Sequence, residues 1–571
     1  MKELVSSRWI VFIILFILTP VPSVNSEYTL VNQETIANTS LSQTEYLIIT
    51  SDAFVDYVQS LAKWKTQRGL FAAIQTVEDI ESQYIGVDLS EKIKNCIRDY
   101  HENQGTTWVV LAGGENIVPT RTVYTNGVYV SCDYYYANLD NNWNVLSSGT
   151  ATIVDANDWE AEVYVGRLPA DNRTQMEDLV SRLIEYERNP PLGPWMKTAL
   201  FAGSFASFDS DTNGNNVFDD DDYSGFDTNR NHNWLVENII PSDWNCILLG
   251  ETEGIQTTQY PYDYSINESI LVECVNDGAS IVMSDAHGSP TSTQRSIFVD
   301  DVDGDGLFDS GTDDIDGSVF LSTSTPFDVG NKLGFYFLAA CSTGTFVGYD
   351  CLTEYITRTS GIGCIGSSAS AYYDPNWYDG ETLGWYTQGL SERFWKRIFS
   401  EDGNHPGKAL ALAKENYSED YVLLNPDAYD GGRTLSQFNL MGDPEVPLWL
   451  DIPLSLNIST TANNATRAIS VLVEADNSPI SDAVVTLVSE SIYQRVVTDV
   501  NGEVQLSMPS VESLSEITIT VSKNGFTPSE AEILIPPAEP GINILSIETA
   551  AITAITIAIV LVIVIMRKRR I

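Results

Sequence analysis

The chain has 571 residues, of which 43% are hydrophobic and 10% aromatic, so it can bury several cores and is not a disordered protein. Its 31 Lys and Arg residues against 78 Asp and Glu residues give a formal net charge of −47. Such a charge disfavours partners among nucleic acids and anionic lipids, and suits basic peptides, cations or simple solubility in a salty exterior. Seven scattered cysteines, without a Cys-x-x-Cys pair, exclude a disulfide scaffold and a zinc-finger type of site.

Both ends of the chain carry targeting features. Residues 1–26 combine a basic opening, an apolar run and a small-residue exit, which is typical of a secretory signal peptide. Residues 549–566 are uncharged and strongly apolar, and the basic tail 567–571 follows. This pattern predicts one transmembrane helix with its basic end in the cytoplasm, a processed tail or a buried helix being the alternative. We therefore expect a single-pass protein of the cell membrane with most of the chain outside.

After a polar linker at residues 27–44, strands and helices alternate through residues 45–195, as in a parallel sheet. Strands are expected at 45–50, 71–76 and 107–112, and helices at 52–68 and 89–102. No cluster of titratable residues stands at the ends of these strands. The segment is therefore interpreted as a supporting α/β subdomain.

A second α/β subdomain is expected at residues 196–450, and it contains two buried strands that end in reactive side chains. A small apolar run ends in Asp285-Ala286-His287-Gly288, and another ends in Ala339-Ala340-Cys341-Ser342. Neighbouring parallel strands bring their C-terminal ends to one edge of the sheet, where functional groups collect. His287 and Cys341 are therefore predicted to meet there.

A cysteine thiol needs a base beside it to become a nucleophile, and His287 is the candidate base. None of the other three histidines, His101, His232 and His405, is placed at a strand end in this way. The pattern indicates acyl transfer, with the backbone N–H groups of Gly288 and Cys341 stabilising the oxyanion. The alternative is structural: a lone Cys is often a buried apolar residue and a lone His a satisfied polar one.

These two motifs resemble the His-Gly and Ala-Cys-x-x-Gly-x-Phe signatures of the gingipain family of cysteine peptidases, which are relatives of the caspases. Three further stretches match in the same order: 162–168, Gly366-Ser367-Ser368-Ala369 and Leu440-Met441-Gly442-Asp443-Pro444. The resemblance covers about residues 45–450. It implies an α/β fold with a caspase-like and gingipain-like parallel-sheet catalytic region of two subdomains.

The resemblance also implies roles for individual residues. Glu162 would lie near His287 and orient its imidazole, the alternative being a surface Glu or an ion pair with Arg167. The aromatic and acidic segment that follows the catalytic strands contains Asp374 and Trp377, which we expect to form a wall of the substrate pocket. Simple aromatic packing is the alternative for this segment.

Two acidic insertions interrupt the second subdomain. Each places oxygen donors at alternate positions before a Gly, which suits a loop wrapped around Ca²⁺. Neither is an ordinary EF-hand, because the twelfth position is not Glu and flanking helices are not evident. The alternative is a pair of solvated acidic turns. The predicted calcium ligands are Asp209, Asp211, Asn213, Asn215 and Asp220 in the first insertion, and Asp301, Asp303, Asp305 and Asp309 in the second.

From residue 451 to about 538, apolar and polar residues alternate and Asn-Gly turns divide the segment. This pattern predicts an Ig-like or carboxypeptidase-regulatory-like β-sandwich, and the linker 539–548 follows it.

The sequence as a whole favours a cell-surface cysteine endopeptidase that acts on proteins or peptides, with structural Ca²⁺ and no organic cofactor. A sortase-like transpeptidase and a non-catalytic, calcium-dependent surface binding protein remain as alternatives.

Overall fold

The computed structural model describes residues 43–153, 158–212, 218, 223–373, 384–400, 403–424, 431–489, 492–537 and 565–566. The predicted signal peptide lies outside these residues, as does the predicted membrane span apart from 565–566. Within the described residues, none of the helices combines the length and apolar character needed to cross a bilayer.

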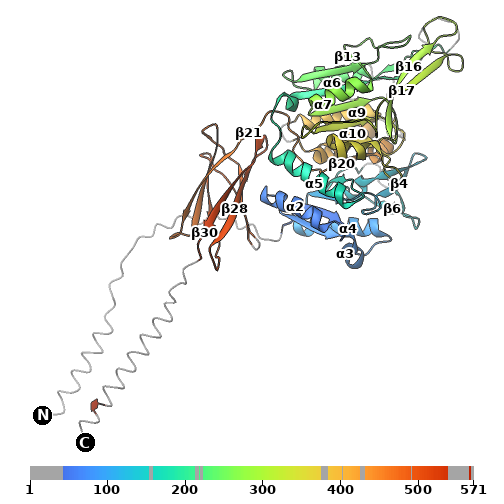
Figure 1. The fold of residues 1–571 in the computed structure, drawn as a ribbon. Coiled ribbons are helices and arrows are strands. Elements are labelled where there is room, and N and C mark those ends of the chain that lie inside the picture. Colours follow the sequence, from blue (N-terminus) through green and yellow to red (C-terminus); the bar gives the residue numbers. More distant parts are fainter. Residues whose placement is uncertain are drawn as a thin grey trace. The chain divides into compact units, whose positions relative to one another are not determined.

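The main feature of the fold is an 11-stranded sheet, drawn from blue to yellow in Figure 1. Its strands are, in spatial order, β13 (Tyr264–Ser265), β12 (Asn245–Gly250), β9 (Thr198–Gly203), β14 (Ile281–Asp285), β18 (Gly334–Ala339), β19 (Gly361–Ser367), β20 (Phe438–Gly442), β8 (Tyr164–Leu168), β3 (Trp108–Ala112), β1 (Tyr46–Thr50) and β2 (Ala72–Thr76). All six residues of β18 are buried, as expected for a strand covered by helices on both faces.

The sheet is mostly parallel, with one reversal. Every neighbouring pair runs parallel except β19 and β20, which are antiparallel. The strands from β20 to β2 therefore run against those from β13 to β19. As a result, the N-terminal ends of β8, β3 and β1 lie at the same edge as the C-terminal ends of β14 and β18. The sequence predicted several strands of each half but not this reversal.

Helices connect the strands and bury their apolar faces against the sheet. Helix α4, for example, begins where the Asp88 side chain accepts the N–H of Glu91 and ends at Gly105, whose φ of 77° suits a glycine cap. The helices are α2 (Val55–Gln67), α3 (Val77–Gln83), α4 (Leu89–Gln104), α5 (Arg173–Arg188), α6 (Asn229–Asn238), α7 (Glu268–Asp277), α8 (Leu352–Thr359), α9 (Tyr386–Ile398), α10 (Pro406–Leu424) and α11 (Gly431–Gln437), with the short 3₁₀ helices η1 (Asp133–Tyr136) and η2 (Pro194–Lys197).

Three smaller sheets accompany the main sheet in the described part of residues 43–450. One has the order β5-β4-β7-β6, one joins β10 to β11, and one is a hairpin that β15 extends and that projects from the sheet in Figure 1. Their strands are β4 (Arg121–Thr125), β5 (Val128–Cys132), β6 (Trp143–Val145), β7 (Thr150–Ile153), β10 (Phe205–Ser207), β11 (Phe226–Asp227), β15 (His287–Ser289), β16 (Ser292–Asp300) and β17 (Asp314–Ser322).

The C-terminal part contains two four-stranded antiparallel sheets that enclose their own apolar core. A short parallel pair, β21 with β29, accompanies them. The strands are β21 (Leu454–Ser455), β22 (Asn457–Asn463), β23 (Ala468–Ala475), β24 (Ser478–Pro479), β25 (Val484–Ser489), β26 (Ile492–Val497), β27 (Glu503–Ser507), β28 (Ser515–Ser522), β29 (Phe526–Thr527) and β30 (Ser529–Ile535). Antiparallel sheets were expected here, and the structure confirms them.

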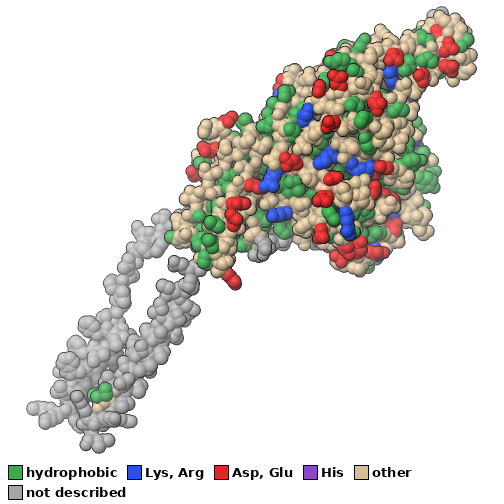
Figure 2. Space-filling model, in the orientation of Figure 1, with side chains coloured by type: hydrophobic (Ala, Val, Ile, Leu, Met, Phe, Trp, Pro, Cys, Tyr) green, Lys and Arg blue, Asp and Glu red, His purple; other side chains and the backbone are tan. Residues whose placement is uncertain are grey.

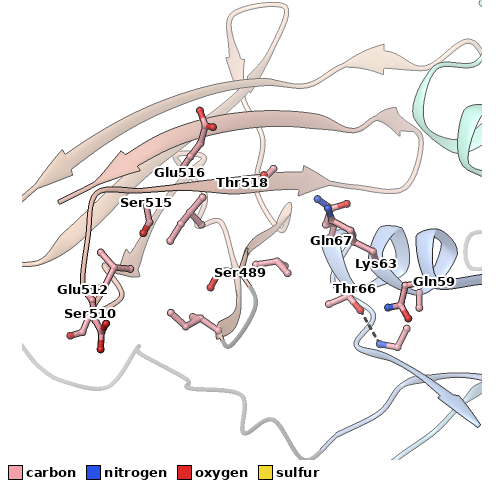
Figure 3. Close-up of a pocket in the computed structure, with 16 residues that line it drawn as sticks. Gln59, Lys63, Thr66, Gln67, Ser489, Ser510, Glu512, Ser515, Glu516 and Thr518 are labelled. Carbon is pink, nitrogen blue, oxygen red and sulfur yellow. Dashed lines mark hydrogen bonds between the residues drawn. The ribbon is translucent and has the colours of Figure 1, made fainter. Parts of the chain in front are cut away.

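The C-terminal sheets contact the end of helix α2 through hydroxyl groups. The Tyr493 hydroxyl donates to the Gly69 carbonyl at 3.0 Å, and the Ser522 hydroxyl donates to the Arg68 carbonyl at 2.8 Å. The Thr486 hydroxyl donates to the Gln67 carbonyl. The Gln67 carbonyl is one of the groups that the end of a helix leaves without a partner, and Arg68 and Gly69 follow it directly, so the C-terminal sheets cap the end of α2. Beside this contact lies a cavity of about 1150 Å³, lined by α2 residues such as Lys63 and by sheet residues such as Glu516 (Figure 3).

A buried group of charges joins α2 to α5 and to the segment after β20. The Lys65 ammonium lies 2.6 Å from carboxylate oxygens of Glu187 and Asp443 and 2.5 Å from Glu445. The Arg68 guanidinium contacts Glu187 and Glu445 as well. Buried carboxylates need positively charged partners, and the Lys65 ammonium supplies that charge in place of a metal ion.

Candidate active site

The structure places His287 and Cys341 at the same edge of the main sheet. Strands β14 and β18 are adjacent and parallel, and Asp285 pairs with Ala339 in the register. Each of the two predicted catalytic residues lies two positions beyond its member of that pair. The ends of the two strands therefore deliver one imidazole and one thiol to equivalent positions.

The two segments that follow these strands, one of them β15, are in contact. A Cβ atom added to Gly288 would lie 2.4 Å from the carbonyl oxygen of Cys341 and 2.9 Å from its nitrogen. Only a residue without a side chain allows so close an approach. The N–H groups of Gly288 and Cys341 are the candidates for binding an oxyanion, and this role stays a prediction.

The His287 side chain is exposed to solvent in part. Partial burial lowers the pKa of His287 below its usual value, and a hydrogen bond with the Ala206 backbone acts in the opposite direction. An imidazole with a lowered pKa is neutral near pH 7. It can then take a proton from a thiol.

Cys341 is half-buried. Like the other six cysteines, it is not part of a disulfide. Its sulfur accepts a hydrogen bond from the N–H of Ala371 at 3.3 Å and lies 3.4 Å from the Ala371 carbonyl oxygen. The next residue, Ser342, has a φ of 59°, which turns the chain sharply after the nucleophile position. Sequence reasoning missed Ala371, because a main-chain N–H leaves no signal in the residue type.

Glu162 is not brought to His287. It lies just before β8, which is four strands away from β14, or about 19 Å at the usual spacing of strands. Its carboxylate accepts the N–H of Leu139 at 2.5 Å. Burial raises the pKa of Glu162, the hydrogen bond from Leu139 opposes this, and the nearby Asp140 adds to it. The alternative pairing with Arg167 is not formed either, since Arg167 binds Asp133 through two hydrogen bonds of 2.7 and 2.8 Å.

A group of buried polar residues lies beneath the His287 loop instead. Asp285, 5% exposed, has a carboxylate oxygen without a hydrogen-bond partner. Burial raises the pKa of Asp285 to about 8, although Asn231 acts against this shift. His232 is fully buried, and burial lowers its pKa to about 3. Asp285 stands two residues before His287, so its position in the motif was the signal that could have marked it.

The predicted wall of the substrate pocket cannot be placed, because Asp374 and Trp377 lie outside the described residues. The residues before them are described. The ring of Tyr373 stacks on Phe226 with centroids 5.1 Å apart, and its hydroxyl lies 3.0 Å from that of Tyr223. This segment therefore runs from Cys341 toward the β10–β11 pair.

The second acidic insertion forms a tight turn with its carboxylates close together, and its role as a Ca²⁺ loop stays a prediction. Asp301 accepts the N–H groups of Gly304 and Gly306 at 2.7 and 2.8 Å, so its carboxylate faces the inside of the turn. Carboxylate oxygens of Asp301, Asp303 and Asp305 lie within 4.8 Å of one another. Figure 2 shows acidic side chains gathered at the far end of this hairpin.

Asp309 and Asp313 close the same loop. The Asp313 carboxylate accepts the N–H of Asp309 at 2.8 Å and that of Val302 at 3.0 Å. Asp313 is 8% exposed, and it was not among the predicted ligands. A carboxylate oxygen of Asp305 is buried without a hydrogen-bond partner.

The two acidic insertions lie beside each other. The Asp209 carbonyl accepts the N–H of Phe308 at 2.8 Å, and Gln256 donates to the carbonyls of Asp209 and Gly306 at 3.0 Å each. The Asp209 carboxylate accepts the N–H of Gly225, and Asp211 is 8% exposed. The other predicted ligands of the first insertion, Asn213, Asn215 and Asp220, lie outside the described residues.

Sequence comparisons relate the chain to a family of known peptidases. The sequence model described as Peptidase family C25 matches residues 39–449. Gingipain R2 of Porphyromonas gingivalis is 22% identical over 488 residues, which cover 83% of this chain and 55% of that protein. Gingipain R1 of the same species is 21% identical over 487 residues, covering 83% and 41%. The chain thus spans about half the length of the curated relatives it matches.

Solved structures show the same fold. The crystal structure of the Arg-specific cysteine proteinase gingipain R superimposes with a TM-score of 0.61 at 19% identity, covering 88% of this chain and 99% of that one. A complex of the pro- and mature domains of Porphyromonas gingivalis RgpB gives a TM-score of 0.60 at 18% identity, covering 86% and 99%. The family model spans most of the catalytic region described above, and the chain therefore belongs to peptidase family C25.

Proposed function

We propose that this protein is a cysteine endopeptidase in which Cys341 is the nucleophile and His287 the general base and acid. The observation that carries the proposal is the matched position of the two residues beyond the paired ends of β14 and β18. The free thiol of Cys341 and the lowered pKa of His287 support it.

In the proposed reaction, the Cys341 sulfur attacks the carbonyl carbon of a peptide bond after its proton passes to His287. The tetrahedral intermediate collapses to an acyl-enzyme when the imidazolium gives that proton to the leaving amine. Water, deprotonated by His287, then releases the acid and regenerates the thiol. Family membership and fold supply no cleavage-site preference for this chain.

An electrophilic peptide tests the nucleophile. A peptidyl acyloxymethyl ketone should label the peptide that contains Cys341, as mass spectrometry would locate it. Cys341→Ala should abolish both labelling and hydrolysis. The matched control is Cys246→Ala, which removes another half-buried free cysteine, and it should retain both. Label on a different residue, or full activity in Cys341→Ala, would refute the assignment.

His287→Ala should lower turnover by roughly 10²- to 10⁴-fold, the usual contribution of a general acid and base. His101→Gln is the control, since His101 bonds the Thr106 carbonyl at the end of α4. Product analysis with an added amine separates the endopeptidase from a transpeptidase, which would transfer the acyl group to that amine.

We further propose that the second acidic loop binds Ca²⁺ as a structural ion. Ca²⁺ prefers six to eight oxygen ligands, and the loop offers converging carboxylates on Asp301, Asp303 and Asp305. The buried, unpartnered oxygen of Asp305 also fits a cation. The other acidic triad, Glu187 with Asp443 and Glu445, fits a metal poorly because Lys65 already binds all three carboxylates.

A location at the outer cell surface is proposed from the sequence. The apolar stretch 549–566 with its basic tail supports anchoring, and residues 1–26 support secretion. Carbonate washing of membranes tests the anchor: the full chain should stay with the membrane, and a chain that ends at residue 540 should be released.

A further inference from the structure

A buried arginine lies behind the segment that contacts the Cys341 sulfur. Arg433, in α11, is 5% exposed. Its guanidinium donates to the Ser370 carbonyl at 2.7 Å and to the Tyr372 hydroxyl at 3.0 Å. It also lies over the Tyr372 ring, 4.5 Å from the centroid. Three contacts therefore fix the guanidinium against residues 370–372.

The Ser370 carbonyl and the Ala371 N–H belong to one peptide group. The chain has no cis peptide bonds in its described residues, so this group is trans and planar. In a trans peptide group the C=O and the N–H point in opposite directions. Arg433 holds the oxygen on one side, and the N–H on the other side donates to the Cys341 sulfur at 3.3 Å. One rigid unit thus connects the guanidinium to the sulfur.

The connection has an electrostatic consequence as well as a geometric one. A cation at the carbonyl oxygen polarises the peptide group and makes its N–H a stronger donor. A sulfur atom that carries negative charge accepts a stronger hydrogen bond than a thiol does. The Arg433 contact therefore stabilises negative charge on the sulfur and fixes the direction of the Cys341 side chain. The Ala371 carbonyl oxygen, 3.4 Å from the sulfur, accepts from the thiol and acts in the opposite direction.

We propose that Arg433 is a positioning residue of the active site, which acts on Cys341 through the Ser370–Ala371 peptide group. The inference rests on the proposed function, because it takes Cys341 as the nucleophile. Arg433 itself touches neither the sulfur nor the substrate in this account. The titratable side chains beside residues 370–373 are His287, Tyr372 and Tyr373. The elements packed against α11 add the buried charged or titratable side chains Glu392 and Arg393 of α9, Lys414 of α10 and Cys132 of β5.

The chain offers a matched control. Arg182 also donates to main-chain carbonyls, those of Thr357 at 3.2 Å, Thr359 at 2.9 Å and Gly361 at 3.2 Å. Gly361 is the first residue of β19, so these contacts lie at the opposite end of that strand from residues 370–372. Arg182→Gln removes an arginine with a similar structural role but no path to Cys341.

The test measures how fast iodoacetamide alkylates Cys341 as a function of pH, with the modified peptide quantified by mass spectrometry. Arg433→Gln should move the midpoint of this profile to higher pH by about one unit, the size expected for weakening one hydrogen bond to a charged group. The same variant should lower kcat by about tenfold and leave KM nearly unchanged. Arg433→Lys, which keeps the charge, should restore part of both effects, and Arg182→Gln should show neither.

A folded Arg433→Gln protein with the wild-type alkylation profile would overturn the inference. Should that variant not fold, Arg433→Lys carries the test: a smaller move in the same direction supports the inference, and an unchanged profile refutes it. The two proposals fail in different ways. Activity retained in Cys341→Ala refutes the proposed function, whereas an inactive Cys341→Ala together with an unchanged profile in the arginine variants refutes the role of Arg433 alone.

Discussion

Gly288 packs directly against the main chain of Cys341. Its missing side chain leaves room for the Cys341 carbonyl oxygen, which would lie 2.4 Å from a Cβ atom at this position. Backbone atoms cannot give way as a flexible side chain can. The loop of the candidate base and the loop of the candidate nucleophile are thus held at a fixed distance by one glycine.

Gly288→Ala should therefore lower kcat/KM by about 100-fold, because it displaces one loop from the other by a fraction of an ångström or more. Hydrolysis of a peptide substrate measures the effect. Gly317→Ala provides the control, since a Cβ there would come no closer than 3.6 Å to another residue. Equal activity in the two variants would show that the contact does not align the site.

Lys65 is predicted to be necessary for stability. Lys65→Met leaves Glu187, Asp443 and Glu445 in the interior with Arg68 as their remaining close cation. Breaking a buried ion pair from one side costs about 3–5 kcal/mol, so the free energy of unfolding should fall by that amount. Urea denaturation measures it. Lys63→Met, on an exposed position of the same helix, should change the free energy of unfolding little.

The raised pKa of Asp285 should lower the free energy of unfolding as the pH rises. Its pKa is about 8 in the folded protein, where burial disfavours the charge, against an ordinary value of 3.8. Between these two values the folded state holds a proton that the unfolded state has lost. Stability should therefore be highest below about pH 4 for this group and fall by at most about 1.4 kcal/mol per pH unit up to about pH 8.

Asp285→Asn removes the titration while keeping the shape of the side chain. Urea denaturation at pH 5 and pH 7.5 should show a smaller loss of stability in this variant than in the wild-type protein. Asp328→Asn, at an exposed position, should behave like the wild type. An identical loss in Asp285→Asn would mean that another group causes the pH dependence.

Calcium should raise the melting temperature if the acidic hairpin binds it. Ligand at 100 times its Kd adds about 2.7 kcal/mol to the free energy of unfolding. Differential scanning calorimetry with Ca²⁺ and with EGTA measures the shift. Asp303→Asn should reduce the shift, and Asp316→Asn, on an exposed position of β17, should not. No shift at millimolar Ca²⁺ would argue against the site.

The positions of His287 and Cys341 could be predicted because each follows a continuous buried strand. Adjacent parallel strands end at one edge, so the sequence pattern and the geometry agree. Glu162 was expected near His287 from the family resemblance and not from this strand pattern. It stands at the same edge, but β19 and β20 lie between its strand and β18, and residue patterns do not reveal the order of strands in the sheet.

Long-range partners explain the other differences. Gln256 joins two acidic insertions that are far apart in the sequence, and Arg433 reaches Ser370 from a later helix. Neither contact follows from local spacing, since an isolated Gln or Arg is usually a surface residue. The N–H of Ala371, which donates a hydrogen bond to the Cys341 sulfur, belongs to the backbone. Almost every residue type has such an N–H, so the sequence gives no sign of it.

The hydroxyl groups of Thr486, Tyr493 and Ser522 that cap helix α2 have a consequence for protein engineering. A catalytic portion transplanted onto a different carrier would lose these donors and expose carbonyls next to the Lys65 charge cluster. A working chimera should therefore carry the matching hydroxyl residues with it, which makes the C-terminal sheets a component of the folded enzyme rather than an exchangeable spacer.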